Sequence, residues 1–253
     1  MKVIFLGTGT SQGIPVIACN CAVCTSTDSK DKRLRSSILV EDNNLTFVID
    51  TGPDFRQQML RAKVKRLDAV LFTHKHKDHT AGLDDVRAFN FRQAQAMPIY
   101  ADALTLSGIE QEFSYIFEDN KYPGIPQLEI HIIDHRPFYL RDLLITPVPV
   151  LHHKMPVLGF RIHNFAYVTD ANYIPPSSME LLQNLDILVL NALRHEKHIS
   201  HFTVSEAIEI IQLLKPKKAY LTHISHLLGK HEEENRKLPP NIELAYDELE
   251  LVI

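Results

Sequence analysis

The most constraining feature of this chain of 253 residues is a six-residue segment that holds three imidazoles and a carboxylate. It follows the apolar run 69–72, whose composition is typical of a buried strand. His74 and His76 are two residues apart, so on an extended chain their side chains point the same way. Asp78 and His79 follow as the chain turns. The segment therefore predicts two adjacent pairs of ligands, suited to two Zn²⁺ or Mn²⁺ ions side by side.

Further candidate ligands each come just after another strand-like apolar run. They are His152, Asp170 and His223. Ligands at the carboxyl ends of several strands are how a layered α/β protein assembles a site from distant parts of its sequence. His153 competes with His152, and the order of the residues alone does not separate the two.

All three cysteines of the chain, Cys19, Cys21 and Cys24, fall within six residues. An odd number of cysteines without a sign of secretion argues against a disulfide framework. Three thiolates need a fourth ligand to complete a closed tetrahedral Zn²⁺ site, and we expect His226, three residues after His223, to supply it. Such a site would clip the N-terminal loop to a segment that carries a catalytic ligand. The alternative is three reduced, unligated thiols in a surface loop.

A glycine-rich segment precedes the cysteines. Gly7, Gly9 and Gly13 follow a strand-like run, a pattern that superficially suggests a dinucleotide-binding loop. That loop requires a helix to begin at the glycines, whereas Ile14 and Pro15 follow here and do not start a helix. We therefore expect a turn that lets the backbone pass close to the metal site.

The segment at 74–79 matches without gaps the H-x-H-x-D-H motif of the metallo-β-lactamase superfamily, which the chain resembles over nearly its whole length. An aspartate at position 50 and the later candidate ligands occur in the family's order. The resemblance implies an α/β fold, a four-layer αββα sandwich with the metals at one edge between two sheets. It also implies the ligand sets: His74, His76 and His152 for one metal, Asp78, His79 and His223 for the other, and Asp170 as the bridge.

Within the superfamily the chain resembles the phosphoribosyl cyclic phosphate diesterases of phosphonate breakdown, which carry a structural zinc beside a dinuclear site. The resemblance rests on the cysteine loop, the glycine-rich segment and residues 222–226. A family histidine near the scissile phosphate corresponds to His201. The family's histidine followed two places later by lysine fits His152 and not His153. Residues 101–126 match nothing in this branch.

The expected activity is hydrolysis of a small cyclic phosphodiester, either a phosphoribosyl cyclic phosphate or a cyclic nucleotide. Two metals about 3.5–4 Å apart can share a bridging hydroxide that attacks phosphorus in line with the leaving oxygen. Asp78 and His201 are the expected catalytic residues, with His201 protonating the leaving group or stabilising its charge. Lys154 is a candidate for additional positive charge nearby.

Other functions of the superfamily fit the sequence less well. The tRNA 3′-processing endonucleases share the histidine motif and the glycine-rich start, but they usually grip tRNA with a basic arm, and the chain has no Gly- and Lys-rich insertion. Lactonases and thioesterases use the same metals but generally lack the cysteine loop. A non-catalytic zinc scaffold would require a broken site, and no ligand position is substituted.

Composition narrows the class of protein further. With 45% hydrophobic residues the chain can bury a sizeable core, and we expect one domain over 1–253. The sequence shows neither an apolar run of membrane-spanning length nor a secretory leader, which together with the free cysteines favours the cytoplasm. A net charge of −4 provides no general basic field for nucleic acid. The expected partner is a small phosphodiester, and the sequence leaves open whether the chain forms a homodimer.

The pattern of apolar residues predicts strands at 3–6, 37–40, 45–49, 69–72, 129–133, 143–148, 159–163, 165–168, 187–190 and 219–221. It predicts helices at 54–62, 84–95, 105–117 and 203–214. The last begins with Thr203 as N-cap and Glu206 as its capping-box partner. The remaining histidines are expected to be surface or structural: His131, His135, His163, His195, His198 and His231.

Overall fold

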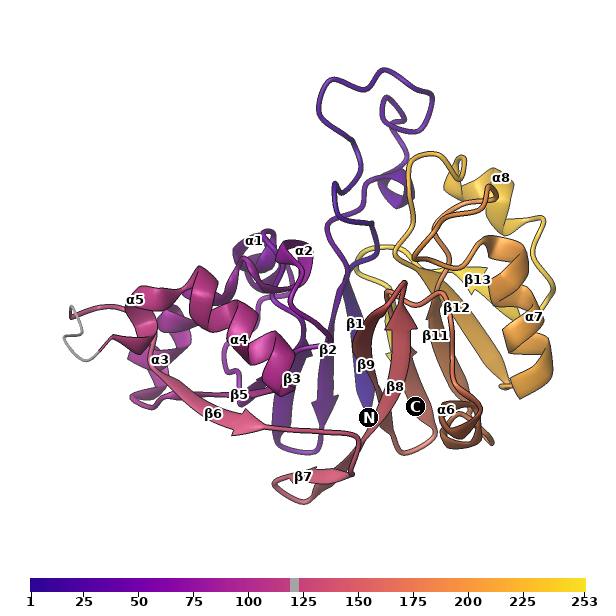
Figure 1. The fold of residues 1–253 in the computed structure, drawn as a ribbon. Helices are drawn as coiled ribbons and strands as arrows, with labels where there is room; N and C mark the ends of the chain where they lie inside the picture. The colour runs from indigo at the N-terminus through magenta and orange to yellow at the C-terminus, as the bar shows by residue number, and fades with distance from the viewer. Residues whose placement is uncertain (119–122) are drawn as a thin grey trace.

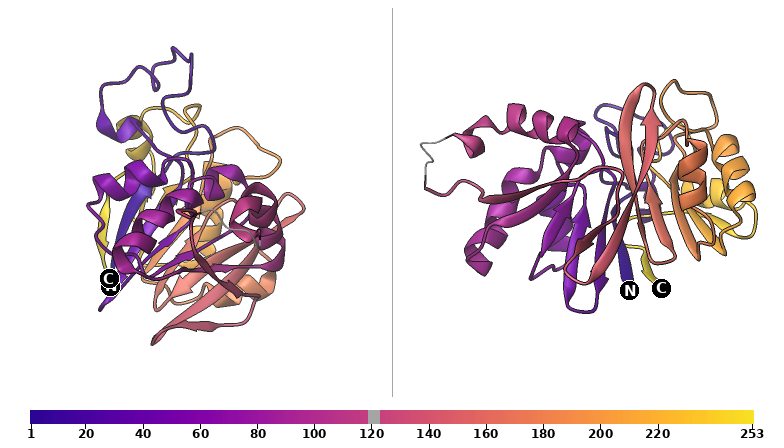
Figure 2. Two further views of the ribbon diagram at one scale, coloured as in Figure 1. Left: turned by 90° about the vertical axis from the view of Figure 1, so that its left-hand side faces the viewer. Right: turned by 60° about the horizontal axis from the view of Figure 1, so that its bottom comes forward.

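The computed structural model describes residues 1–118 and 123–253, which form two seven-stranded sheets with helices on their outer faces (Figure 1). Residues 119–122, within the stretch that matches nothing in the family branch, lie outside the described residues. The two further views keep the helices outside both sheets (Figure 2). The predicted four-layer αββα sandwich is therefore confirmed.

The first sheet has the strand order β14-β1-β2-β3-β4-β5-β6. Its strands are β1 (Lys2–Gly7), β2 (Ser37–Asp42), β3 (Leu45–Ile49), β4 (Ala69–Leu71), β5 (Met97–Ala101), β6 (Leu128–Ile132) and β14 (Glu250–Val252). Strands β3 to β6 pair in parallel, while β14, β1, β2 and β3 pair antiparallel. Because β2 is antiparallel to both β1 and β3, the exits of β1, β3 and β4 reach the same edge.

The second sheet has the order β13-β12-β11-β10-β9-β8-β7. Its strands are β7 (Phe138–Leu140), β8 (Leu143–His152), β9 (Met155–Ile162), β10 (Phe165–Val168), β11 (Ile187–Asn191), β12 (Lys218–Thr222) and β13 (Ile242–Leu244). Strands β10 to β13 pair in parallel, whereas β7 to β10 pair antiparallel. The exits of β8, β10 and β12 therefore share one edge, the upper one in Figure 1.

Helices cover the outer face of each sheet (Figures 1 and 2). On the first sheet they are α1 (Phe55–Arg61), α2 (Lys77–Thr80), α3 (Arg87–Gln93), α4 (Ala103–Glu112) and α5 (Ser114–Phe117), with a 3₁₀ turn, η2 (Leu83–Val86), before α3. On the second sheet they are α6 (Pro176–Leu181), α7 (Val204–Leu214) and α8 (His231–Asn235). A further 3₁₀ turn, η1 (Ser29–Asp31), lies in the N-terminal loop.

The inner faces of the sheets share one apolar core. Phe5 and Phe47 of the first sheet and Phe160, Tyr167 and Val189 of the second belong to the same buried cluster. Full burial of such side chains contributes about 1.5–3 kcal/mol each, so this cluster holds the two sheets together. Separate clusters join each sheet to its own helices.

Helix α7 shows how the sequence specifies one of these outer layers. Its buried residues Ala207, Ile211 and Leu214 recur at helical spacing and pack on the second sheet. The helix begins at the predicted capping box, in which the side chains of Thr203 and Glu206 each accept from the other's backbone N–H. It ends at a left-handed residue, Lys215, directly before a proline.

The predicted strands all occur. The structure contains four further strands, and two of the predicted helices have different bounds. Strands β5, β7, β13 and β14 were not predicted, since three of them have only three residues and β5 contains Pro98. The predicted helix at 84–95 begins as a 3₁₀ turn, and the one at 105–117 begins earlier and is interrupted at Phe113, where φ is −114° and ψ is 41°. Within the described residues no helix is both long and apolar enough to cross a membrane.

Candidate metal centres

The predicted ligands converge because their strands end at one edge. Asp50 follows β3, His74 follows β4, His152 ends β8, Asp170 follows β10 and His223 follows β12. Three of these residues, Asp50, Asp170 and His223, have φ of 69°, 54° and 58°. Residues other than glycine rarely adopt this left-handed conformation, and functional sites are where it concentrates.

Asp170 lies at the centre of the cluster. Its carboxylate is within 4.8 Å of the ligand atoms of each of three groups of side chains. These groups are Asp78, His79 and His223; His74 and His76; and His152 and His201. Asp170 Oδ1 is 3.3 Å from His79 Nε2 and 3.1 Å from His223 Nδ1, while its Oδ2 is 3.8 Å from His74 Nε2. A residue with both oxygens placed in this way can bridge two ions.

Each of four histidines holds a hydrogen-bond partner on the ring nitrogen that faces away from the cluster. His79 Nδ1 is 2.7 Å from Asp50 Oδ2, and His74 Nδ1 is 3.0 Å from Thr73 Oγ1. His152 Nδ1 donates to the carbonyl of Ser200 at 2.8 Å, and His223 Nε2 is 3.0 Å from Thr10 Oγ1. Such outer partners fix the ring orientation and the tautomer of a metal-ligating histidine.

The inward nitrogens of this cluster lack partners. His74 Nε2, His79 Nε2, His223 Nδ1 and His201 Nδ1 are buried and form no hydrogen bond with any described residue. A buried polar atom without a partner costs about 1–3 kcal/mol, and here several of them face carboxylate oxygens around one space. The donor set therefore fits divalent metal ions bound by imidazole and carboxylate.

Burial and charge set the ionisation of the cluster. Burial lowers the pKa of His74 and His223 below the ordinary value. Burial opposes ionisation of Asp170, but the imidazoles of His223 and His79 outweigh it and hold the pKa of Asp170 well below its usual range. Burial lowers the pKa of His79, but the carboxylates of Asp170, Asp78 and Asp50 have the larger effect. The pKa of His79 therefore lies well above its ordinary value. A metal ion would take the place of that proton among the carboxylates.

His201, the predicted catalytic residue, lies against the cluster from the loop before α7. Its ring centroid is 4.5 Å from that of His152 and 4.8 Å from that of His223. Burial lowers the pKa of His201 to about 3, so its imidazole is neutral near pH 7. Its Nδ1 could contact either a metal ion or an oxygen of a substrate.

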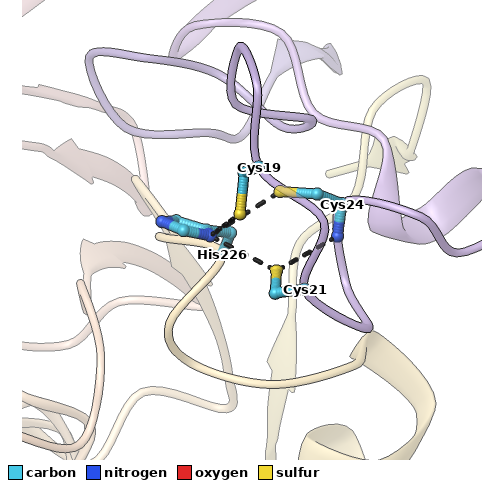
Figure 3. Close-up of side chains that lie close together, drawn as sticks. All are labelled: Cys19, Cys21, Cys24 and His226. Carbon is cyan, nitrogen blue, oxygen red and sulfur yellow. Dashed lines mark hydrogen bonds between the residues drawn. The ribbon is translucent and has the colours of Figure 1, made fainter.

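The three cysteines and His226 form a second cluster (Figure 3). The sulfurs of Cys19, Cys21 and Cys24 lie 3.4, 3.4 and 3.6 Å from Nδ1 of His226. In a tetrahedral site with metal–sulfur bonds of about 2.3 Å and a metal–nitrogen bond of about 2.0 Å, nitrogen and sulfur are about 3.5 Å apart. The four ligand atoms therefore have the spacing of a closed zinc site, as the sequence predicted.

Local hydrogen bonds favour a thiolate in this second cluster. The backbone N–H of Cys24 and the ring of His226 lower the pKa of Cys21 to about 6, whereas burial raises the pKa of Cys24 to about 11. The loop that carries the cysteines stands above the upper edge of the sheets in Figure 1. It reaches His226 in the segment that follows β12, so the two clusters share that segment.

The structure also decides details that the order of residues left open. His152 is buried with its ring against His201, whereas His153 and Lys154 are exposed in the turn after β8. The glycine-rich turn passes close to the cluster as expected, since Gly9 pairs with Ile224, the residue after His223, and Thr10 Oγ1 lies 3.0 Å from His223 Nε2.

Sequence reasoning missed the residues that orient the ligands, Thr10, Thr73 and Ser200. Two single hydroxyl groups and one backbone carbonyl carry no spacing signal in a sequence. It also left His198 as a surface or structural residue, whereas the structure places its ring centroid 5.1 Å from that of His201.

Comparison with known proteins decides the family. The sequence profile described as "Beta-lactamase superfamily domain" matches residues 46–224 of this chain. The chain belongs to the β-lactamase superfamily. The predicted superfamily is thereby confirmed, and at the level of the family so is the predicted enzyme class, a metal-dependent hydrolase.

Individual relatives refine this placement within the superfamily. A solved structure described as a new diphosphatase from the PhnP family is 44% identical, covers 100% of this chain and 97% of its own, and superposes with a TM-score of 0.93. This likeness supports the predicted branch.

Two curated relatives carry other names. An octanoyltransferase of Porphyromonas gingivalis is 40% identical over 100% of this chain but only 52% of its own length, so this chain spans about half of that relative. A ribonuclease Z of Anoxybacillus flavithermus is 23% identical over 98% of this chain and 96% of its own length.

Proposed function

We propose that this chain is a metal-dependent phosphodiesterase that acts on a small substrate. The observation that carries the proposal is the ring of buried, unpartnered imidazole nitrogens around Asp170, with the additional imidazole of His201 against it. A superfamily member with 44% identity that is described as a diphosphatase supports chemistry at phosphorus. The same scaffold hosts other hydrolyses, so the assignment depends on the site and on the relative together.

The proposed dinuclear site holds two Mn²⁺ or Zn²⁺ ions. His74, His76 and His152 would bind one, Asp78, His79 and His223 the other, and Asp170 both. Such a pair supplies positive charge that lowers the pKa of water and neutralises the phosphate oxygens. The proposed structural ion is Zn²⁺ bound by Cys19, Cys21, Cys24 and His226.

The protein's own groups have distinct roles in this proposal. The carboxylate of Asp78 lies 3.3 Å from His79 Nε2 and would help to hold the second ion beside the imidazoles. Asp50 accepts from His79 and keeps that ring turned towards the site. His201 is neutral, so we assign it the role of hydrogen-bond donor to the leaving oxygen, whose charge grows in the transition state.

Our first candidate substrate is a small cyclic phosphodiester, either a phosphoribosyl cyclic phosphate or a cyclic nucleotide. A net charge of −4 supplies few cationic contacts for long RNA, whereas a recessed pair of dications suits one diester. The description of the 44% identical relative favours a second candidate, a diphosphate diester, in which the same attack would cleave a P–O–P bond.

The deciding experiment is a panel assay of the metal-loaded protein. Its substrates are bis-p-nitrophenyl phosphate, a cyclic ribose phosphate, a cyclic nucleotide, a diphosphate diester, a lactone and a precursor tRNA. We expect the small phosphorus substrates to be cleaved far better than the last two. The His201→Ala variant should lower kcat about 100-fold with little change in KM, since the group acts in the transition state.

Two results would contradict the proposal. Efficient cleavage at the tRNA 3′ end with weak activity on small diesters would assign the chain to the endonucleases. Activity on the lactone alone would exclude chemistry at phosphorus. The single domain over 1–253, the homodimer and the cytoplasmic location stay predictions from the sequence.

A further inference from the structure

The edge of the first sheet at β6 differs from the other sheet edges of the described structure. Strands β7, β13 and β14 form those other edges and have three residues each, whereas β6 has five. Its register with β5 runs without a shift, and it contains neither proline nor lysine, which often protect an edge strand from pairing. Figure 1 shows β6 at the outer side of the first sheet. This edge is therefore suited to accept a further strand.

The backbone of β6 presents hydrogen-bonding groups on its open side. The carbonyl of Gln127 and the N–H of Ile133, at the two ends of the strand, both bond to β5. Because the direction of the backbone groups alternates along a strand, the odd-numbered residues between them also face β5 and the even-numbered residues face outward. The outward residues are Leu128, Ile130 and Ile132, and no other described residue forms a hydrogen bond to their backbone groups.

The side chains on the two faces of β6 differ in character. Ile130 and Ile132 lie on the face that meets the helices, where they are 40% and 67% exposed. Glu129 and His131 lie on the opposite face, with Glu129 Oε1 3.1 Å from His131 Nε2. The ring of His131 stacks on that of Tyr100 in β5, with centroids 4.5 Å apart and planes at 9°. The open edge thus has an apolar face and a face on which an acid and an imidazole are held in place.

The sequence of β6 is complementary to itself in an antiparallel pair. A two-fold axis at Ile130 puts Glu129 of one copy opposite His131 of a second copy, and Leu128 opposite Ile132. The outward residues are then the ones that form hydrogen-bonded pairs, as an antiparallel ladder requires. Apolar side chains meet apolar ones, and each carboxylate meets an imidazole, which are favourable cross-strand pairs. An axis at Glu129 would instead put two carboxylates opposite each other, which is unfavourable.

We propose that two copies of this chain form a dimer by antiparallel pairing of their β6 strands about a two-fold axis at Ile130. The pairing joins the first sheets of the two copies into one continuous sheet and covers the exposed isoleucines. The occupant of the edge is a second copy, because the charges and the apolar side chains of β6 match those of β6 itself. This inference concerns assembly and does not depend on the proposed phosphodiesterase function.

The test measures the mass of the metal-loaded full chain in solution by sedimentation over a range of concentrations. We expect the wild-type protein to have the mass of two chains. The Ile130→Glu variant puts two carboxylates opposite each other across the axis and should raise the dissociation constant of the dimer about 100-fold or more. The Ile130→Val variant keeps a β-branched apolar side chain and should remain a dimer.

The control for the added charge is Val252→Glu. Val252 is 86% exposed on β14, the edge strand at the other end of the same sheet. This variant carries the same new carboxylate and should leave the dissociation constant unchanged. A wild-type dimer that Ile130→Glu does not weaken would overturn the proposal, since the interface would then lie elsewhere. Equal weakening by Ile130→Glu and Val252→Glu would overturn it too, because the effect would then be one of net charge.

A cross-linking experiment tests the register and does not require Ile130→Glu to fold. In the proposed pair the two Cα atoms at position 130 are about 5.5 Å apart, within the range of a disulfide. With oxidised glutathione, Ile130→Cys should form a covalent dimer, whereas the wild-type protein and Val252→Cys should not. Absence of this cross-link would overturn the register. A wild-type protein that stays a monomer at every concentration would overturn the dimer, and binding of an unrelated extended peptide would then assign the edge to another protein.

Discussion

Thr10 Oγ1 lies 3.0 Å from His223 Nε2, and this contact joins the glycine-rich turn to the proposed dinuclear centre. Two backbone hydrogen bonds reinforce it, from Thr10 N–H to Ile224 O at 3.1 Å and from Ile224 N–H to Thr8 O at 2.9 Å. His226, a ligand of the cysteine cluster, is three residues beyond His223. The two proposed metal centres are thus attached to one short segment, which the N-terminal turn holds in place.

The Thr10→Val variant keeps the shape of the side chain but removes the hydroxyl. We expect it to weaken binding of the active-site metals about tenfold, because the outer partner of a ligating histidine sets its orientation and tautomer. Competition with a metal-binding chelator measures the affinity, and Thr10→Ser should keep most of it. An affinity unchanged in Thr10→Val would mean that the backbone bonds alone hold His223 in place.

The Cys21→Ser variant tests the closed site. The loaded protein should contain about three metals per chain, and this variant should lose one zinc and lower Tm by roughly 5–10 °C, since the binding energy of a structural zinc is folding energy. Elemental analysis measures the zinc content and thermal unfolding measures Tm. Ala22→Ser, at an exposed neighbouring position, is the control. No more than one metal in carefully loaded wild-type protein would contradict the prediction of three metals. Unchanged zinc content and unchanged Tm in Cys21→Ser would contradict the structural zinc site.

The Asp170→Ala variant tests the centre of the cluster. Asp170 is the carboxylate common to the ligand groups, so its removal should abolish turnover and the binding of both active-site metals. The zinc of the cysteine cluster should remain, and Tm should fall less than in Cys21→Ser. Asp134→Ala is the control, since Asp134 is a half-exposed carboxylate that pairs with Arg136 and belongs to neither cluster. Retention of both active-site ions in Asp170→Ala would show that Asp170 does not bridge them.

Stability should fall in acid because of His231, which belongs to neither metal cluster. Its Nδ1 lies 3.0 Å from Arg33 Nη2, and burial together with the charge of Arg33 lowers the pKa of His231 from 6.5 to about 4. The folded state thus binds this proton less readily than the unfolded state, so the contribution is full above pH 6.5 and declines as pH falls towards about 4.

Chemical denaturation across that range measures this pH dependence. The His231→Asn variant places an amide oxygen near the position of Nδ1 but cannot take up the proton. It should therefore show a flatter loss of stability between pH 6.5 and about 4 than the wild-type protein. Parallel curves for the two proteins would show that other groups control the acid transition.

The sequence predicted those features that depend on interactions between residues close together in the chain. The spacing of His74, His76, Asp78 and His79 after an apolar strand indicated a metal site, because that spacing puts the side chains together on any chain that leaves a strand. The capping box of Thr203 and Glu206 was readable for the same reason, as it joins residues three apart. Strands that are buried on both faces, between the shared core and a layer of helices, showed continuous apolar runs in the sequence.

Other features depend on contacts between distant residues. Strands β7, β13 and β14 have three residues each and persist because a neighbouring strand pairs with them, so their own sequence carries too weak a pattern. The choice of His152 over His153 depends on which face of β8 meets the carbonyl of Ser200, 48 positions later.

By itself the sequence determined the ligand types and the two clusters in which they would gather, since these follow from residue chemistry and spacing. Its resemblance to the superfamily implied the type of fold. Only the tertiary structure decided which nitrogen of each imidazole faces the metals and which residues orient them. Thr10 and His223 are 213 positions apart, and nothing in either segment specifies the hydrogen bond between them. It forms because β1 and β12 end at the same edge of the two packed sheets. A polar atom buried at that edge is stable only when it forms a hydrogen bond, and the fold decides which side chains are near enough to form it.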